Sequence, residues 1–373
     1  MGARSALIYD SRRYLAAVLS VTFAGLLMLV QVALLQGLFR GTSIPIDESS
    51  AQLWIGFPSV PSVDMGRPAS RHADALARVH PAVERVESFS STYGDVRRAD
   101  GVAVFVTVSV IETQREAMAF SRLLTAHQRA LLDEPDALII DSADQRKLDV
   151  QIGSLLEVNG KRARIVDVVE GIRTMGGVSA IASFATGQRF DASVRREEPL
   201  YFLLRLRPGA DAAQVAREIA DTAPVPRYSV WLAEDFSQQS QLYWLFESGA
   251  GVGAGFGALL ALVVGVVITS QTLAAAILTS IKEFAALRAL GVSHASLRGV
   301  VLQLASWIGF AGLVLTALLT LGVAVLADAY RVAIAFTWWS LLGTALIIMF
   351  ITSLSGLYAL RPLFKAEPAS LLR

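Results

Sequence analysis

The chain has 373 residues, of which 33 are lysine or arginine and 32 are aspartate or glutamate, and its formal net charge is +1. Apolar residues make up 54% of the chain and charged residues 17%, whereas about 25% of the residues in soluble domains are charged. This composition excludes a disordered chain, and the absence of cysteine excludes disulfide frameworks, thiol catalysis and cysteine-ligated metals.

Four long stretches of the sequence carry no charged side chain. A membrane-spanning helix needs about 20 predominantly apolar residues, and each stretch is longer than that. We therefore predict an α-helical membrane protein with four transmembrane helices, at residues 15–39, 250–275, 300–326 and 334–360. The first is predicted to be an uncleaved anchor, because its apolar stretch exceeds that of a signal peptide and no small-residue cleavage site closes it.

The distribution of lysine and arginine predicts the topology. The tails (residues 1–14 and 361–373) and the loop 276–298 together hold nine lysine or arginine residues and three acidic residues. Residues 41–247 hold 22 lysine or arginine residues and 28 acidic residues. The positive-inside rule places the tails and the loop in the cytoplasm and the large domain on the opposite side. A mildly acidic domain on that side also argues against a nucleic-acid partner.

Residues 40–247 are predicted to form a periplasmic α+β domain with two lobes. Alternating apolar residues predict a strand at 102–112, and Asn159-Gly160 within 157–170 predicts a β-hairpin. Further strands are expected at 200–206 and 228–232, and helices at 70–79, 113–132 and 211–222, with Ser70 and Thr113 as N-caps. The order of these elements suggests that 45–112 pairs with 198–235 and that 113–197 is an inserted lobe.

The second predicted span belongs to an uncharged run that is longer than a span. A helix of residues 248–281 would extend about 50 Å, whereas the hydrocarbon core is roughly 30 Å thick. Residues 234–247 lack glycine and proline and can continue this helix, so we predict a stalk at about 234–249. The alternative is a loop followed by a tilted helix.

Gly249, Gly253 and Gly257 are spaced by four residues at the start of the second span. Small residues at this spacing allow two helix backbones to approach closely in lipid. The alternative is a flexible joint between the outer domain and the membrane.

The cytoplasmic loop contains a predicted amphipathic helix at 280–291. Ile281, Phe284 and Leu287 recur at helical spacing, and Gly291 suits a left-handed C-cap. The alternative is a helix that lies on the lipid surface.

The sequence has no pattern typical of an enzyme or an ion-coupled transporter. Its four histidines do not have metal-ligand spacing, there is no GxSxG or HExxH motif, and no charge lies inside a predicted span. We therefore predict no catalytic, cofactor-binding or metal-binding residues.

The run 282–291 (KEFAALRALG) resembles the signature loop of FtsX-like permeases, the membrane subunits of MacB-type ABC transporters. The C-terminal 367–373 (EPASLLR) resembles the tail of these permeases, and the predicted topology agrees with theirs. Residues 255–273 and 136–142 more narrowly resemble DevC-type permeases. Residues 269–271 (TSQ), however, lack the tyrosine that DevC-type chains often carry, and the ATPase that MacB fuses to its permease is missing, as in DevC.

The resemblance implies a homodimeric permease subunit of a tripartite exporter in the bacterial inner membrane. Its implied partners are a separate cytoplasmic ATPase dimer that binds ATP and magnesium, a periplasmic adaptor and an outer-membrane duct. The implied mechanism is mechanotransmission, in which ATPase closure moves the 280–291 helix and thereby the outer domains. The expected coupling residues are Ile281, Lys282, Glu283, Phe284, Leu287, Arg288 and Gly291.

Three alternative functions remain open at this point. The same fold can extract a lipid, haem or lipoprotein from the membrane, or it can act as a signalling scaffold that activates a cell-wall hydrolase. The third alternative is a membrane-anchored enzyme.

Overall fold

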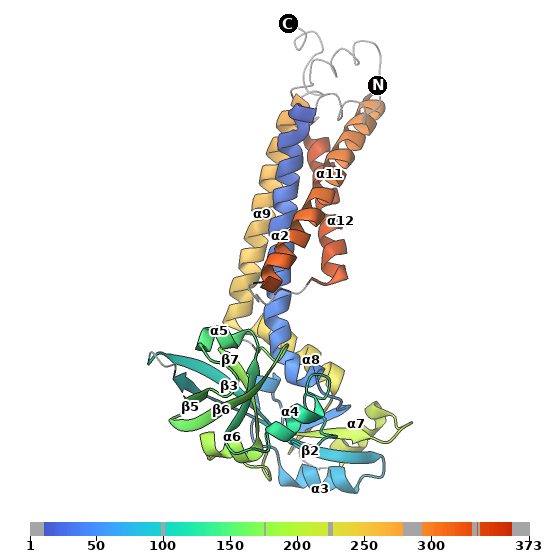
Figure 1. The fold of residues 1–373 in the computed structure, drawn as a ribbon. Helices are drawn as coiled ribbons and strands as arrows, with labels where there is room; N and C mark the ends of the chain where they lie inside the picture. The colour runs from blue at the N-terminus through green and yellow to red at the C-terminus, as the bar shows by residue number, and fades with distance from the viewer. Residues whose placement is uncertain are drawn as a thin grey trace. The chain divides into compact units, whose positions relative to one another are not determined.

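The computed structural model describes residues 11–97, 101–174, 177–222, 227–278, 293–329, 334 and 336–359. The chain divides into two compact units. The first, the membrane unit, comprises residues 1–37 and 251–373, and the second, the α+β domain, comprises residues 38–250. Figure 1 shows both units, with most of their helices and several of their strands labelled.

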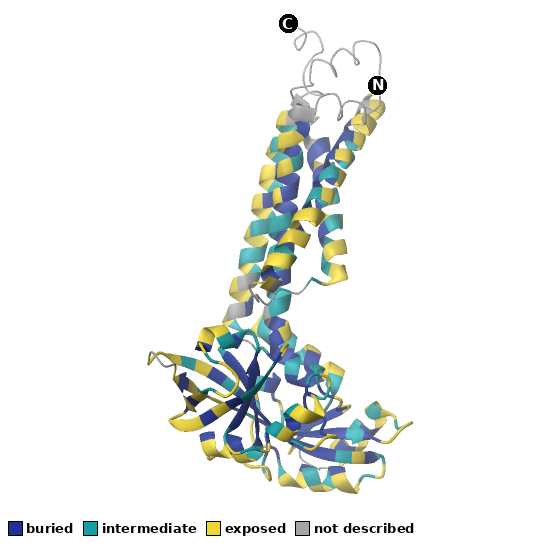
Figure 2. Cartoon of the chain, in the orientation of Figure 1, coloured by how far each residue is buried: buried dark blue, intermediate teal, exposed yellow. Residues whose placement is uncertain are grey.

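Four long helices run through the membrane unit. They are α2 (Ser11–Asp47), α9 (Gly249–Leu278), α11 (His294–Ala329) and α12 (Trp338–Ala359). Each contains a stretch that is long and apolar enough to cross a membrane, at Tyr14–Gly37, Gly251–Thr272, Arg298–Ala327 and Trp338–Leu357. Many of their apolar side chains are exposed (yellow in Figure 2), which suits helices surrounded by lipid. The prediction of four apolar helices is confirmed.

Nine strands form the sheet of the α+β domain. They are β1 (Leu53–Gly56), β2 (Val83–Arg97), β3 (Ala103–Ile111), β4 (Ala137–Asp141), β5 (Leu155–Val158), β6 (Lys161–Val169), β7 (Val178–Ser183), β8 (Tyr201–Leu206) and β9 (Ser229–Leu232). Their order is β3-β7-β4-β6-β5-β2-β8-β1-β9, and β3 also pairs with β2. This additional pairing closes six of the strands into a ring, whereas β8, β1 and β9 extend the sheet beyond it.

Short helices flank the strands. They are η1 (Val63–Met65), α3 (Arg71–Val79), α4 (Ala126–Leu131), α5 (Asp144–Leu148), α6 (Phe184–Phe190), α7 (Ala212–Asp221), α8 (Ala233–Leu242) and the π-helical turn η2 (Tyr243–Glu247). Ser70 and Asp211 cap α3 and α7, because each side chain accepts a hydrogen bond from a backbone N–H in the first turn. The predicted helices at 70–79 and 211–222 are therefore confirmed.

Strand β2 joins the two lobes of the domain. Its first half, Val83–Phe89, pairs with β8, and its second half, Ser90–Arg97, pairs with β3. The interior of the six-stranded ring is filled by apolar side chains such as Val106, Val108 and Ile165, all of them fully buried. The adjoining core is aromatic, with Trp54 in edge contact with Phe89 and Tyr201.

The predicted strands and hairpin agree with the structure. Asn159 and Gly160 connect β5 to β6 with positive φ angles of 52° and 72°, which is the backbone that an Asn-Gly hairpin turn requires. Strand β3, however, pairs in parallel with β7 of the inserted lobe as well as with β2. Strands β1 and β2 of 45–112 pair with β8 as predicted, and β3 in addition joins this part of the chain to the inserted lobe.

The predicted helix at 113–132 is wrong over most of its length. Only Ala126–Leu131 is helical, and Thr125, not Thr113, is the N-cap, with a capping box to Gln128. The backbone N–H groups of Met118 and Ala119 donate to the buried carboxylate of Glu87 instead of to an intrahelical carbonyl. A long-range carboxylate acceptor thus replaces the local helix pattern that the sequence favoured.

Candidate functional site

Two segments lead into the α+β domain, and their helices differ in continuity. Helix α2 runs for 37 residues, about 55 Å, from Ser11 to Asp47 without a break, although Pro45 lies within its last turn. Helix α8 and turn η2 together cover 233–247 and end at Ser248, which is extended (φ −85°, ψ 144°). The predicted stalk, a continuous helix from 234 into the second span, is therefore interrupted at Ser248.

Polar side chains attach the end of α2 to α8. Ser237 Oγ donates to Asp47 Oδ1 (2.6 Å), and Ser43 Oγ donates to Asp47 Oδ2 (2.7 Å). Gln241 Nε2 donates to Ser43 Oγ (2.8 Å), and Arg122 Nη1 donates to the Asp47 carbonyl (2.5 Å). We call Ser43, Asp47, Ser237 and Gln241 the clamp. Ile46 lies beside it in the aromatic core, so that the last turn of α2 is part of the domain interior.

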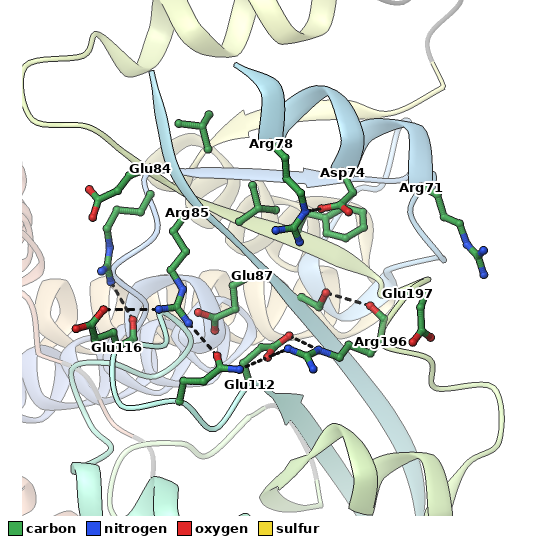
Figure 3. A pocket seen from close by; sticks show the side chains of 16 residues that line it. Arg71, Asp74, Arg78, Glu84, Arg85, Glu87, Glu112, Glu116, Arg196 and Glu197 are labelled. Atoms are coloured by element: carbon green, nitrogen blue, oxygen red, sulfur yellow. Dashed lines mark hydrogen bonds and ion pairs between the residues drawn. The ribbon is translucent and has the colours of Figure 1, made fainter. Parts of the chain in front are cut away.

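A charged cleft of about 1080 Å³ lies on the same domain (Figure 3). Its lining includes five arginines and six carboxylates: Arg71, Arg78, Arg85, Arg196, Arg205, Asp74, Glu84, Glu87, Glu112, Glu116 and Glu197. They come from α3, from β2 and β8, and from the segments that follow β3 and precede β8. The cleft therefore adjoins the strand that joins the two lobes.

The cleft's charges largely pair with one another. Arg196 contacts the carboxylate of Glu112 through two nitrogens, and Nε lies 2.7 Å from Oε1. Glu112 is 8% exposed, so this two-point contact fixes the segment before β8 to the end of β3. Arg85 donates a hydrogen bond to Gln114 Oε1 (2.8 Å) and forms an ion pair with Glu116, which is labelled in Figure 3.

Two ionisable side chains at or near the cleft lining, Glu87 and Arg129, are buried. Glu87 is 2% exposed, and burial raises the pKa of its carboxyl, although hydrogen bonds from Met118 and Ala119 and the nearby arginines oppose this. Arg129 is also 2% exposed and donates to the carbonyls of Glu112 (3.2 Å) and Ala119 (2.5 Å). These contacts hold the segment after β3 in place and give the charges a structural role.

Family models match both parts of the chain. Residues 14–222 match the model described as MacB-like periplasmic core domain, which is more than half of the chain. Residues 255–368 match the model described as FtsX-like permease C-terminal.

The chain belongs to the MacB-type family of FtsX-like permeases.

Solved structures also resemble the permease. The periplasmic region of MacB from Actinobacillus actinomycetemcomitans aligns with a TM-score of 0.38 and 10% identity, covering 52% of this chain and 94% of that one. The extracellular domain of the noncanonic ABC-type transporter YknZ from Gram-positive bacteria aligns with a TM-score of 0.35 and 14% identity, covering 49% and 100%. A comparison with curated proteins found no match.

The predicted coupling residues of the permease, Ile281, Lys282, Glu283, Phe284, Leu287, Arg288 and Gly291, lie outside the described residues. Their role stays a prediction. The three glycines of the second span lie in α9. A Cβ at Gly249 or Gly253 would meet nothing within 4 Å, and at Gly257 it would lie 3.2 Å from Gln31 Nε2. Within one chain, therefore, Gly249 and Gly253 have room, and their contact with a second copy stays a prediction.

Other glycines of the membrane unit permit close helix contacts that the sequence analysis missed. A Cβ at Gly312 of α11 would lie 2.4 Å from Val21 of α2, and a Cβ at Gly25 would lie 2.7 Å from Ile348 of α12. Small residues let helix backbones approach closely in lipid. Isolated glycines within apolar runs were the only signal for these contacts, because they do not repeat at a spacing of four.

Among the described residues, no group of three or more histidine, aspartate or glutamate side chains has a geometry that would hold a metal ion. The described residues do form the clamp at the end of α2 and the paired charges of the cleft.

Proposed function

We propose that this permease is the membrane subunit of a DevC-like tripartite ABC exporter and works as a homodimer. In this proposal it transmits the closure of a cytoplasmic ATPase to its α+β domain, which drives export of a substrate taken from the periplasm or the outer leaflet. The proposed location is the bacterial inner membrane, with the α+β domain in the periplasm.

The observation that carries this proposal is the continuity of α2 together with the clamp at its end. A helix is stiff along its axis because each turn is hydrogen-bonded to the next. The hydrogen bonds of Asp47 and Ser43 attach the last turn of this helix to α8. A displacement of the helix is therefore transferred to the domain that the clamp holds.

The proposed partners follow from the family. The membership of the chain in an ABC permease family implies an ATPase partner. In the proposal this ATPase is a separate dimer that binds ATP and magnesium, and an adaptor and an outer-membrane duct complete the export path. The permease itself is proposed to have no nucleotide site and no catalytic activity.

The proposed contact with the ATPase is the helix at 280–291. Phe284 and Leu287 are three residues apart, so they share a face of a helix and can enter an apolar groove. Glu283 and Arg288 are proposed to orient the helix through polar contacts at the rim, together with Lys282. Gly291 is proposed to end it.

The test is co-purification and ATPase stimulation with the double variant Phe284→Ala, Leu287→Ala. Truncating a buried interface anchor costs about 2 kcal/mol or more, so recruitment of the ATPase and its stimulation by the permease should fall together. The purified permease alone should show no ATP turnover. Full recruitment and full stimulation by the double variant would refute the proposed coupling helix.

A further inference from the structure

A second hollow of about 540 Å³ lies in the α+β domain, away from the cleft's charges. Its volume is within the range of small-molecule sites, roughly 300–1,000 Å³. The described side chains and glycine that line it are Gly41, Thr42, Pro45, Val63, Asp64, Met65, Phe89, Ser91, Tyr93, Phe105, Thr107, Ser109, Thr174 and Trp244. We call it the apolar hollow, because aliphatic and aromatic groups dominate its lining.

One face of the antiparallel pair β2–β3 forms the floor of the apolar hollow. Ser91 lies opposite Ser109 and Tyr93 lies opposite Thr107 in the strand register. Since alternate residues of a strand point to one face, these four side chains and Phe105 share that face. The serine and threonine side chains of this floor are small, so they leave space above the two strands.

The aromatic residues of the floor are exposed, unlike those of the core. Tyr93 and Phe105 are 44% and 48% exposed, whereas Phe89 is 1% exposed. The rings of Tyr93 and Phe105 stack at 5.8 Å with an interplanar angle of 15°. Met65, 38% exposed, adds a flexible thioether. A cluster of large exposed apolar groups inside a concavity is typical of a binding site for an apolar body.

Asp64 is the one charged residue in the described lining. Its Oδ1 accepts hydrogen bonds from Trp244 Nε1 (3.1 Å) and from Ser62 Oγ. Its carbonyl accepts one from Tyr93 Oη (2.5 Å). Among the described residues no lysine or arginine forms an ion pair with its carboxylate. The carboxylate is thus oriented by neutral donors, and its negative charge is not compensated by a described cation.

The floor offers a second polar point. Ser91 Oγ is buried from water and makes no hydrogen bond of ordinary geometry among the described residues, although the Tyr93 hydroxyl lies close enough to interact with it. A ligand's polar atom can give this hydroxyl a better partner.

We propose that the apolar hollow binds a cationic amphiphile, with its apolar body against Tyr93, Phe105 and Met65 and its positively charged head at Asp64. Charge complementarity favours this class over anionic or neutral amphiphiles, because an uncompensated carboxylate repels an anion and gains nothing from a neutral head. Binding in the apolar hollow does not depend on the proposed export function. Only the further step, that the bound amphiphile is the exported substrate, rests on that proposal.

Binding can be measured on the whole permease in lipid nanodiscs, without the ATPase. The chain has no cysteine, so Thr107→Cys, which is half-buried in the floor, gives a single reactive thiol. The probes are dodecyltrimethylammonium, dodecyl maltoside and dodecyl sulfate below their micellar concentrations. The readout is the rate at which the thiol reacts with a water-soluble maleimide.

We expect dodecyltrimethylammonium to slow the labelling of Thr107→Cys about tenfold at saturation, and at lower concentration than either other probe. The matched control is Glu197→Cys, an exposed position that lines the charged cleft. Its labelling rate should not change. Equal protection by all three probes, or protection by none, would overturn the proposal.

A second variant tests the role of the carboxylate. Asp64→Asn keeps an oxygen for Trp244 but removes the negative charge that attracts the quaternary ammonium head, which has no N–H to donate. In the Thr107→Cys background, Asp64→Asn should weaken protection by dodecyltrimethylammonium about tenfold and leave that by dodecyl maltoside unchanged. Unchanged protection by the cation would contradict the assignment of Asp64.

The outcome for the apolar hollow is separable from that for the export proposal. Selective protection in a permease that never stimulates an ATPase would support the hollow and refute the export function. An ATPase-coupled permease whose hollow is not protected would refute the hollow alone.

Discussion

The first and second segments that enter the α+β domain begin from similar apolar helices but reach it differently. Helix α2 continues to Asp47 and is held by the clamp, whereas the helical segment 233–247 is separated from α9 by the extended Ser248. A continuous helix transfers displacement, and an extended residue between two helices permits bending. In the proposed function, the first segment would therefore transmit force to the domain and the second would accommodate the movement.

The largest effect should come from breaking α2 where it enters the domain. Arg40 is exposed, so Arg40→Pro changes mainly the backbone, and a proline inside a helix costs about 3 kcal/mol. We expect ATPase stimulation by the permease to be lost while the ATPase still co-purifies. Arg40→Ala is the control and should retain stimulation. Normal stimulation by the proline variant would show that α2 need not be continuous.

The next effect concerns the second copy of the permease. Replacing Gly253 and Gly257 by leucine adds bulk where we predict helix backbones to approach in the dimer. The variant should become monomeric by mass photometry in nanodiscs. The control is Gly322→Leu in α11, since a Cβ there, as at Gly253, meets nothing within 4 Å among the described residues. If the leucine variant stays dimeric and active, Gly253 and Gly257 act as a flexible joint or have no role.

Removing the clamp should have an intermediate effect. Asp47→Ala deletes the acceptor for Ser237 and Ser43, each a bond to a carboxylate worth about 1.5–3 kcal/mol. The melting temperature of the α+β domain should fall and ATPase stimulation should drop several-fold. Asp47→Asn retains one acceptor oxygen and should lie between this variant and the unchanged protein. If the melting temperature falls strongly but ATPase stimulation stays complete, the clamp stabilises the domain without transmitting movement.

A change in the stability of the α+β domain that does not involve the clamp should leave ATPase stimulation unchanged. Burial raises the pKa of Glu87 above its ordinary 4.5, so the folded domain keeps the proton to a higher pH than the unfolded chain. The free energy of unfolding should therefore decrease as pH rises from about 4.5 through the raised pKa. Glu87→Gln should remove this dependence, measured by denaturant unfolding across pH, and should leave ATPase stimulation intact. A pH dependence that persists in the variant would place its origin elsewhere.

The smallest effect is expected at the interrupted segment. Gly249 is the first residue of α9, and Ser248 before it is extended, which is the backbone that a following proline favours. Gly249→Pro should therefore change neither folding nor stimulation. Loss of stimulation would show that a flexible glycine joint is needed there.

Local patterns predicted much of this fold because the elements concerned are stabilised by residues close to them in the sequence. The cap at Ser70, the helix predicted at 211–222 and the turn at Asn159-Gly160 need only residues within a few positions. The charge-free runs were long enough to indicate the four apolar helices.

The failures arose where distant residues decide the structure. The carboxylate of Glu87 takes the N–H groups of Met118 and Ala119, and so residues 114–124 do not become helical. Helix α2 passes Gly41 and Pro45 because its last turn is held by α8, about 190 residues away in sequence. The charged cleft brings together side chains from α3, β2, β8 and the loops after β3 and before β8, and the apolar hollow brings together α2, η1, β2 and β3. No spacing rule along the chain joins these segments.

We propose that ATP-driven movement reaches the α+β domain through the membrane helices. A spin label at Lys161→Cys, an exposed position in the β5–β6 hairpin, gives one distance between the two copies of a labelled dimer. We would measure this distance by pulsed electron paramagnetic resonance in the complex with its ATPase, without nucleotide and with ATP trapped by a hydrolysis-deficient ATPase. The account predicts two different distance distributions, and it predicts that Arg40→Pro abolishes the difference. Identical distributions with and without ATP in the unchanged permease would contradict it.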